Sequence, residues 1–230
     1  MTSPSARWFA IAVIGGVAAV VVTAVVLLGI GVSDTSPPSL EENPNPAIAG
    51  DILYVDEASC IVLARASGEA RGQVHCTGVI PQLLYFLDDR RIAYLVPNPY
   101  PNNFVIVDLE SGRELERRTV DPSRPTFDFA APDGTRIFQR DGARLDLIRD
   151  GQVTGTLTFD GLDWPPNLVG WSPDSQWLAF FYYPPRGRGA ELWLVSRDGR
   201  VRGTLATGVV GGAIAWRFPD GRAWPQPPAD

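Results

Sequence analysis

Two cysteines and one histidine are the residues of this chain best suited to specialised chemistry, and they lie in one short part of the sequence, residues 60–76. Cys60, His75 and Cys76 are the only residues of these two types in the sequence. Both cysteines lie eight residues from Gly68, so a hairpin turning at Gly68 would place them opposite each other on antiparallel strands. This approach suits a disulfide, and we predict a Cys60–Cys76 bond; two unpaired buried thiols are the alternative.

A metal site is not expected from the same residues. Zinc needs three or four ligands, whereas His75 and Cys76 are neighbours on an expected strand and therefore point to opposite faces. No metal and no cofactor is predicted, and His75 is interpreted as a partly exposed strand residue.

The sequence also lacks the residue sets of common hydrolases. A serine triad would have to use His75, and no Gly-x-Ser-x-Gly motif or phosphate-binding glycine loop is present. Glycoside hydrolysis needs only two carboxylates, which Asp160 and Asp163 beside Trp164 could supply. An Asp-Gly-Leu-Asp segment between strands is, however, more typical of a turn. We predict that the protein is not an enzyme.

Turn-forming sequences recur along the chain and indicate the elements that carry these residues. One marker is an aspartate in a tight turn, repeated 41 to 46 residues apart at Asp88, Asp133, Asp174 and Asp220. A second is a turn glycine, repeated 39 to 48 residues apart at Gly68, Gly112, Gly151 and Gly199. The short apolar runs between these markers have strand lengths, and residues 50–230 show no helical periodicity. A period of about 40 to 45 residues with four strands each predicts the blades of a β-propeller.

The best-preserved unit is WSPDSQWLAFF…ELWLVSRDG, residues 171–199. It resembles the repeats of TolB-like and other WD-like bacterial β-propellers, whose blades carry a similar Ser-Pro-Asp-Gly turn followed by an apolar strand. The resemblance covers residues 51–224 and implies a fold rather than an activity. This chain departs from that pattern because such propellers commonly have six or more blades.

The ends of the repeat region complement each other. The first unit has no first strand before Gly50, whereas the last unit has a first strand, residues 213–218, and little more. We therefore predict an all-β fold, a small β-propeller of about four blades of four antiparallel strands, closed by pairing of N- and C-terminal strands. Residues 222–224 could instead take the place of residues 52–55. A twisted β-sandwich, or an open array completed by another subunit, is the alternative fold.

An uncharged apolar stretch at residues 8–32 predicts a membrane anchor. About 20 apolar residues span a bilayer, whereas the apolar region of a cleaved signal peptide, the alternative, usually has about 7 to 15. Arg7 precedes the stretch and Asp34 follows it, which favours a cytoplasmic N-terminus. The expected organisation is a cytoplasmic N-terminus (1–7), a transmembrane helix (8–32), a Pro/Ser-rich linker (33–50) and an extracytoplasmic domain (51–230) of a single-pass protein in the cytoplasmic membrane.

The net charge of −6 argues against nucleic acid as a partner, because no basic stripe could neutralise phosphates. The expected partners are the lipid bilayer, through residues 8–32, and one or more proteins.

In a propeller the tight turns share one face, and the longer loops and blade crossings share the other. The tight-turn face is expected to be inert. Tyrosine, tryptophan and arginine in the longer loops are residue types that anchor protein interfaces, although such loops also cap blades without binding anything. The predicted partner-binding residues are Tyr100, Asn102, Asn103, Asp121, Arg124, Asp163, Trp164, Tyr183, Arg186 and Arg188.

We predict a membrane-anchored protein-binding or scaffolding module, such as an accessory subunit of a membrane complex. A glycan- or ligand-binding sensor, or a hydrolase, that uses the same loop face is the alternative.

Overall fold

The computed structural model describes residues 48–68, 70–96, 103–120, 130–140, 143–163, 165–185, 189–212 and 214–228. All described residues belong to one compact unit, which lies within Pro37–Asp230. The predicted cytoplasmic N-terminus, membrane helix and most of the linker therefore lie outside the described residues. Within the described ranges, no helix is long and apolar enough to cross a membrane.

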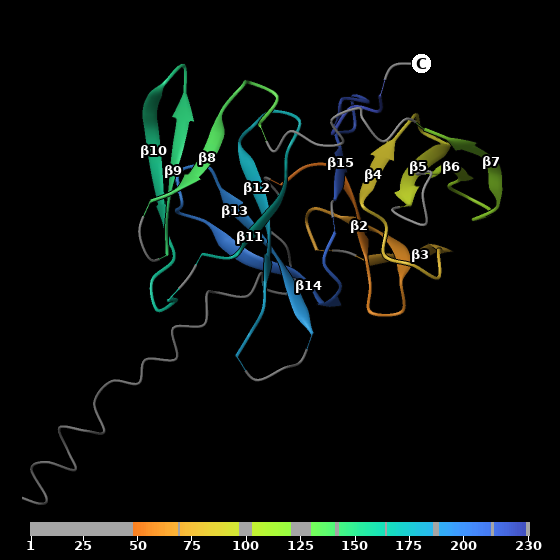
Figure 1. Cartoon of the computed structure of the whole chain (residues 1–230), viewed down its shortest axis with the longest axis horizontal. Coiled ribbons are helices and arrows are strands. Elements are labelled where there is room, and N and C mark those ends of the chain that lie inside the picture. The colour runs from red at the N-terminus through yellow and green to blue at the C-terminus, as the bar shows by residue number, and fades with distance from the viewer. Residues whose placement is uncertain are drawn as a thin grey trace, which may run out of the picture. The chain divides into compact units, whose positions relative to one another are not determined.

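The described part of the chain is built from antiparallel strands in four sheets and contains no helix (Figure 1). The first sheet has the order β16 (Ala223–Trp224), β15 (Ala215–Arg217), β1 (Asp51–Val55), β2 (Cys60–Arg65), β3 (Ala70–Cys76). The second has β4 (Leu83–Phe86), β5 (Arg91–Val96), β6 (Asn103–Asp108), β7 (Glu114–Thr119). The third has β10 (Gln152–Thr158), β9 (Arg144–Arg149), β8 (Arg136–Gln139), and the fourth has β11 (Asn167–Trp171), β12 (Trp177–Tyr182), β13 (Ala190–Ser196), β14 (Arg202–Val209).

The predicted pairing between the N- and C-terminal strands of the domain is confirmed. Strand β15 pairs antiparallel with β1, so that Ile52 lies opposite Trp216 and Asp51 opposite Arg217. The Arg217 guanidinium lies 3.2 Å from the Asp51 carboxylate, and the Trp216 indole N–H donates to the Ala49 carbonyl at 3.0 Å. Strand β16 pairs with the other edge of β15. The alternative, in which residues 222–224 replace residues 52–55, is therefore wrong.

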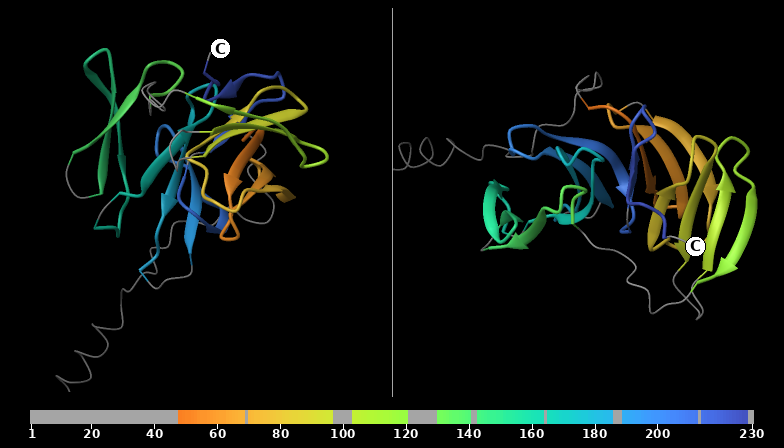
Figure 2. Two further views of the ribbon diagram at one scale, coloured as in Figure 1. Left: turned by 45° about the vertical axis from the view of Figure 1, so that its right-hand side comes forward. Right: turned by 90° about the horizontal axis from the view of Figure 1, so that it is seen from above.

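Neighbouring sheets lie side by side (Figure 2). Apolar clusters between them hold them together. Leu53 on β1 belongs to a cluster shared with the second sheet, whereas its neighbour Ile52 belongs to a cluster shared with the fourth. Leu157 and Phe180 belong to a third cluster, which joins the third and fourth sheets. The spatial order is therefore second, first, fourth, third sheet, which is a propeller-like arrangement and not a two-sheet sandwich.

The described residues account for three of the four interfaces of the predicted ring. No core cluster among them joins the second sheet to the third. The third sheet shows three described strands rather than the expected four, and the chain just before it, residues 121–129, lies outside the described ranges.

The disulfide and the turn chemistry also agree with the sequence. Cys60 lies opposite Cys76 in the β2–β3 pair, and their sulfur atoms are bonded at 2.01 Å. The turn aspartates accept hydrogen bonds from their own turns; for example, Asp174 Oδ1 accepts the Gln176 N–H at 3.0 Å. Local side-chain bonds of this kind favour turns over regular structure, which explains why they mark the repeat.

Candidate functional site

The predicted partner-binding residues are only partly described. Tyr100, Asn102, Asp121, Arg124, Trp164, Arg186 and Arg188 lie outside the described residues. Asn103 is the first residue of β6, Asp163 lies exposed between β10 and β11, and Tyr183 follows β12 with 55% of its surface exposed. Their role in binding stays a prediction. Tyr183 is the one of the three whose surroundings define a surface.

Three exposed apolar side chains and two glycines form this surface, which we call the loop-face patch: Val79, Ile80, Tyr183, Gly211 and Gly212. Val79 is 44% and Ile80 46% exposed in the connection between β3 and β4. A Cβ atom at Gly211 would lie 3.0 Å from Tyr183 Oη, and one at Gly212 would lie 3.7 Å from Ile80 Cγ2. The bare backbone between β14 and β15 thus touches both Tyr183 and Ile80, and the exposed side chains belong to one continuous surface.

The disulfide fixes one side of the loop-face patch. Cys76 ends β3, and the chain leads from it through Thr77 and Gly78 to Val79. The Thr77 backbone N–H donates to the Ser59 carbonyl at 3.0 Å, and the Thr77 hydroxyl donates to the same oxygen at 2.7 Å. The covalent bond to Cys60 and these hydrogen bonds hold the backbone of residues 76 and 77 in place. They thereby limit the movement of the exposed Val79 and Ile80 that follow.

The loop between β1 and β2 fixes the other side. The Glu57 N–H donates to the Gly208 carbonyl at 3.0 Å, and the Val210 N–H donates to the Val55 carbonyl at 3.0 Å. These bonds hold the end of β14 just before Gly211. Burial and the nearby Asp56 carboxylate raise the pKa of Tyr54, which therefore stays neutral beneath this loop. The patch thus rests on backbone contacts between the first and fourth sheets.

Apart from the loop-face patch, the structure has a groove between the third and fourth sheets, next to their short turns. We call it the inter-sheet groove; its volume is about 570 Å³. Its lining residues are Leu147, Thr154, Gly155, Thr156, Gln176, Trp177, Ser196, Arg197 and Asp198. The expectation that the tight-turn face is inert stays a prediction.

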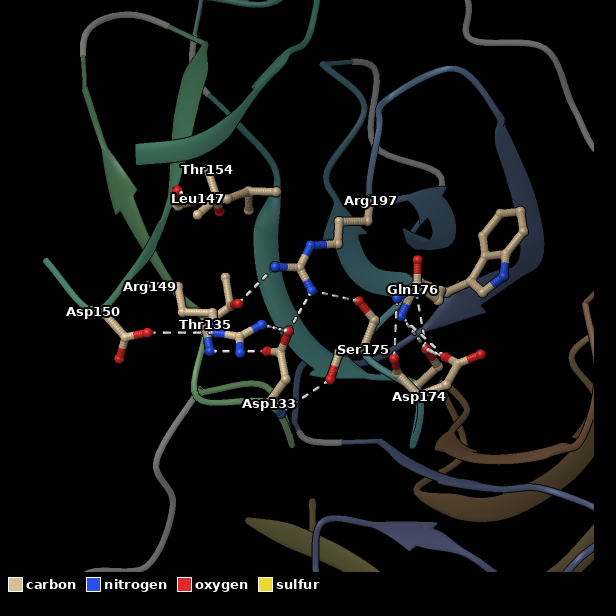
Figure 3. A network of polar contacts seen from close by, with 12 residues as sticks. Asp133, Thr135, Leu147, Arg149, Asp150, Thr154, Asp174, Ser175, Gln176 and Arg197 are labelled. Carbon is tan, nitrogen blue, oxygen red and sulfur yellow. Dashed lines mark hydrogen bonds and ion pairs between the residues drawn. The ribbon is translucent and has the colours of Figure 1, made fainter. Parts of the chain in front are cut away.

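Arg197 connects the two sheets beside the groove (Figure 3). Its Nη1 atom donates to Asp133 Oδ2 at 2.6 Å and to the Ser175 carbonyl at 3.2 Å, and its Nη2 donates to Thr135 Oγ1 at 2.7 Å. Arg149 Nη1 approaches the same Asp133 oxygen at 3.4 Å. Burial alone would raise the pKa of Asp133, but hydrogen bonds from Arg197 and Thr135 outweigh it, and the pKa is lowered. Asp133 is therefore ionised, and it binds the Arg197 guanidinium of the fourth sheet.

The other residues that could carry out specialised chemistry, His75 and Asp160, do not belong to a recognisable reactive site among the described residues. His75 is half-buried, with Nδ1 2.9 Å from the Gly112 carbonyl and Nε2 3.1 Å from Tyr94 Oη, so it bridges the first and second sheets. Within the described ranges, no group of three or more His, Cys, Asp or Glu residues could hold a metal ion. Asp160 lines a cavity of about 300 Å³ with Arg144 and their neighbours; Asp163 is not part of its lining.

These features define the class as an all-β, propeller-like domain with an apolar patch on its loop face. The chain matches no protein-family model and no curated protein. Solved structures to which this chain is similar include a nidogen/laminin complex, with a TM-score of 0.28 and 16% identity over 73% of this chain and 70% of that one.

TolB from Acinetobacter baumannii is another, with a TM-score of 0.25 and 13% identity over 79% of this chain and 54% of TolB. Kuenenia stuttgartiensis hydrazine synthase gives a TM-score of 0.27 and 15% identity over 84% of this chain and 57% of that one. The chain thus spans little more than half the length of the last two. The fold assignment rests on the strand pairing and sheet order described above.

Proposed function

We propose that this chain is a single-pass membrane protein, with a cytoplasmic N-terminus, that displays its propeller-like domain outside the cytoplasm as a protein-binding or scaffolding module. In this role it acts as an accessory subunit of a membrane complex and binds its partner instead of catalysing a reaction. The observation that carries the proposal is the loop-face patch, in which Val79, Ile80 and Tyr183 expose apolar surface on one fixed platform.

The chemistry of the patch favours a protein as the partner. Contiguous exposed apolar side chains mark interaction surfaces, and tyrosine adds a large, rigid contact with one polar end. Gly211 and Gly212 have no side chains, so a partner can approach their backbone closely. The patch offers no charge cluster that would favour an ionic ligand.

The compartment is supported by two independent features. A disulfide such as Cys60–Cys76 persists in oxidising surroundings outside the cytoplasm. The uncharged residues 8–32 have the length of a membrane span.

The orientation can be tested on intact cells with an antibody-accessible or alkylatable tag attached after residue 230. The tag should be labelled without lysis, because the domain is proposed to lie outside the cytoplasm. Labelling only after lysis would refute this orientation.

The binding site can be tested by photo-crosslinking followed by an affinity measurement. A photoreactive residue at position 183, in the full-length protein in native membranes, should crosslink a partner that the same residue at position 115 does not. Leu115 is a matched control because it is also an exposed apolar residue, at 44%, but lies on β7.

The affinity of the purified partner can then be compared between variants. Each patch side chain is about half exposed, so burying the rest contributes on the order of 1 kcal/mol each. The combined substitution of Val79, Ile80 and Tyr183 by serine should weaken binding about 100-fold, whereas Leu115→Ser should have no effect. Equal affinities for the triple variant and the control would refute the assignment of the patch.

A further inference from the structure

The outer strands of the four sheets differ in how they are protected against pairing with another chain. An exposed sheet edge is a template for a further strand, and proteins protect such edges with charged side chains, bulges or proline. Strands β3, β7, β10 and β14 lie at these edges, and each has a register shift against its neighbour. Bulges therefore do not distinguish them.

Charge does distinguish them. Strand β3 contains Arg71, β14 contains Arg202, and β7 is Glu-Leu-Glu-Arg-Arg-Thr. Strand β10 reads Gln-Val-Thr-Gly-Thr-Leu-Thr and has no charge at all. Its valine and threonines have high strand propensity. Among the described outer strands, β10 is thus the one with no charged residue.

The backbone of β10 is open on the side away from β9. Strand β10 lies at the outer margin of the third sheet, at the left of the domain in Figure 1. At its end, the Thr158 carbonyl accepts a hydrogen bond from the Arg202 guanidinium, and Phe159 N–H donates to the Ala143 carbonyl. No described residue makes a backbone hydrogen bond to the outer edge between Gln152 and Thr156.

The sheet next to this edge exposes apolar side chains on one face. Val153 is 57% and Phe138 53% exposed. Val153 lies opposite Ile148 on β9, whereas the next residue along β9, Leu147, points to the other face and into the cluster shared with the fourth sheet. The face with Val153 and Phe138 is therefore the one turned away from the fourth sheet. This surface is separate from the loop-face patch, whose residues come from other segments.

We propose that β10 pairs with β10 of a second copy of this chain, antiparallel about a twofold axis. In such a pair the strand meets a second copy of itself, so every charged side chain of the strand is brought twice against the partner strand and loses hydration there. The uncharged β10 avoids this loss, and threonine side chains facing each other across strands are favourable. Val153 of each copy would extend the apolar surface that the pairing covers.

Self-pairing at this edge would leave the loop-face patch free, so that one dimer would present two patches. Pairing along residues 152–156 buries less area than a stable complex usually needs, and we expect a concentration-dependent dimer. If the proposed membrane anchor holds both copies in one plane, their effective concentration rises without any new contact.

Cysteine crosslinking of the full-length protein in detergent tests this proposal. The native cysteines are bonded to each other, so a cysteine introduced on β10 supplies the free thiol. We expect Val153→Cys, Thr154→Cys or Thr156→Cys, each tested alone, to form a covalent dimer on mild oxidation, with the highest yield nearest the twofold axis. Leu115→Cys, on the charged outer strand β7, is the control and should stay monomeric.

Sedimentation equilibrium separates this contact from dimerisation through the membrane helix. Val153→Lys should raise the dimer dissociation constant about tenfold or more, since each copy would bring one lysine charge into the short interface and apolar contact would be lost. Leu115→Lys should change nothing, and thermal unfolding should be the same for both variants because both positions are exposed.

The proposal is overturned if the unmodified protein is a monomer at all concentrations, if Leu115→Cys crosslinks as well as the β10 variants, or if Val153→Lys leaves the dimer unchanged. The triple serine variant of the loop-face patch should still crosslink through β10. Loss of partner binding and loss of self-pairing are thus separate outcomes.

Discussion

Arg197→Met is expected to weaken the contact between the third and fourth sheets. Arg197 lies on the turn after β13 and reaches Asp133 and Thr135 on the turn before β8 (Figure 3). Methionine keeps much of the apolar stem and removes the guanidinium. The change therefore tests the polar contacts with little loss of packing.

The size of the effect follows from the contacts that are lost. The bond to the Asp133 carboxylate is short, at 2.6 Å, and both side chains are largely buried, with 20% and 25% exposure for Arg197 and Asp133. Hydrogen bonds to charged groups contribute about 1.5–3 kcal/mol, and the hydroxyl of the fully buried Thr135 also loses the guanidinium as a donor. Arg149 at 3.4 Å remains near Asp133 and limits the cost. We expect the free energy of unfolding to fall by about 3 kcal/mol.

Urea unfolding of the full-length protein in detergent, followed by tryptophan fluorescence, measures this change. Arg200→Met is the matched control, because Arg200 is 84% exposed and lies 3.6 Å from Asp198. Its cost should stay below about 0.5 kcal/mol. A double-mutant cycle of Arg197→Met with Asp133→Asn should give a coupling energy of about 2 kcal/mol. Equal costs for Arg197→Met and Arg200→Met would refute the assignment of Arg197 as the connection between the sheets.

The pH dependence gives a second test of the same contact. The pKa of Asp133 is lowered from its ordinary 3.8 in the folded protein, so its stabilising contribution is present above that value. The contribution is lost as the pH falls through the lowered folded-state pKa, because the carboxylate is then protonated in both states. The stability difference between the unmodified protein and Arg197→Met should therefore shrink below about pH 4. A difference that is constant down to pH 2 would contradict the ionic character of the contact.

Three other perturbations test the disulfide, one turn and one buried tyrosine. The double substitution of Cys60 and Cys76 by serine should lower the unfolding free energy by about 3 kcal/mol, as expected for a sequence separation of 16 residues, and a reductant should then have no further effect on the urea midpoint. Gly112→Ala should destabilise the domain more than Gly151→Ala, because both have positive φ angles, of 66° and 76°, but only at Gly112 would a Cβ meet a backbone oxygen, that of Val74 at 2.2 Å; equal urea midpoints would contradict the described contact between the first and second sheets. Burial raises the pKa of Tyr85 to about 12 from 10.0, so its contribution is present below pH 10 and is lost as the pH rises toward 12. Tyr85→Phe should lose less stability than the unmodified protein between these pH values, and an identical alkaline loss would argue against the burial of this phenol.

Local chemistry explains the features of the fold that could be predicted from the sequence. Turn aspartates such as Asp174 and Asp88 bond to their own backbone, so their spacing reports the repeat without tertiary information. The position of Cys60 and Cys76 about Gly68 fixes their register in the same way. Closure by β15 could be predicted because the first and last units each lack the strand that the other has.

The position of β16 could not be predicted in this way. Ala223 packs against the cluster between the first and second sheets, and Trp224 packs against the cluster between the third and fourth. A two-residue strand has too little sequence pattern to specify such contacts. Its place beside β15 depends on the surfaces that the assembled sheets present.

The candidate site, too, has residues that the sequence pattern indicates and residues that depend on the assembled sheets. Tyr183 was predicted because an aromatic residue stands in a long loop. Val79 and Ile80 were missed because they lie in a connection between units, where the sequence does not reveal whether an apolar pair is buried; their position between Gly78 and Pro81 was the available signal. The Arg197–Asp133 contact joins residues 64 positions apart and leaves no periodic trace.

The pairing of β1 with β15 also sets an order of events during synthesis. Strand β1 leaves the ribosome early, but its partner, residues 215–217, is among the last segments of the domain to be made. The edge of β1 that carries Ile52 can therefore pair only after the strands of the other three sheets have been synthesised. The first sheet to begin forming is the last of the four to be completed.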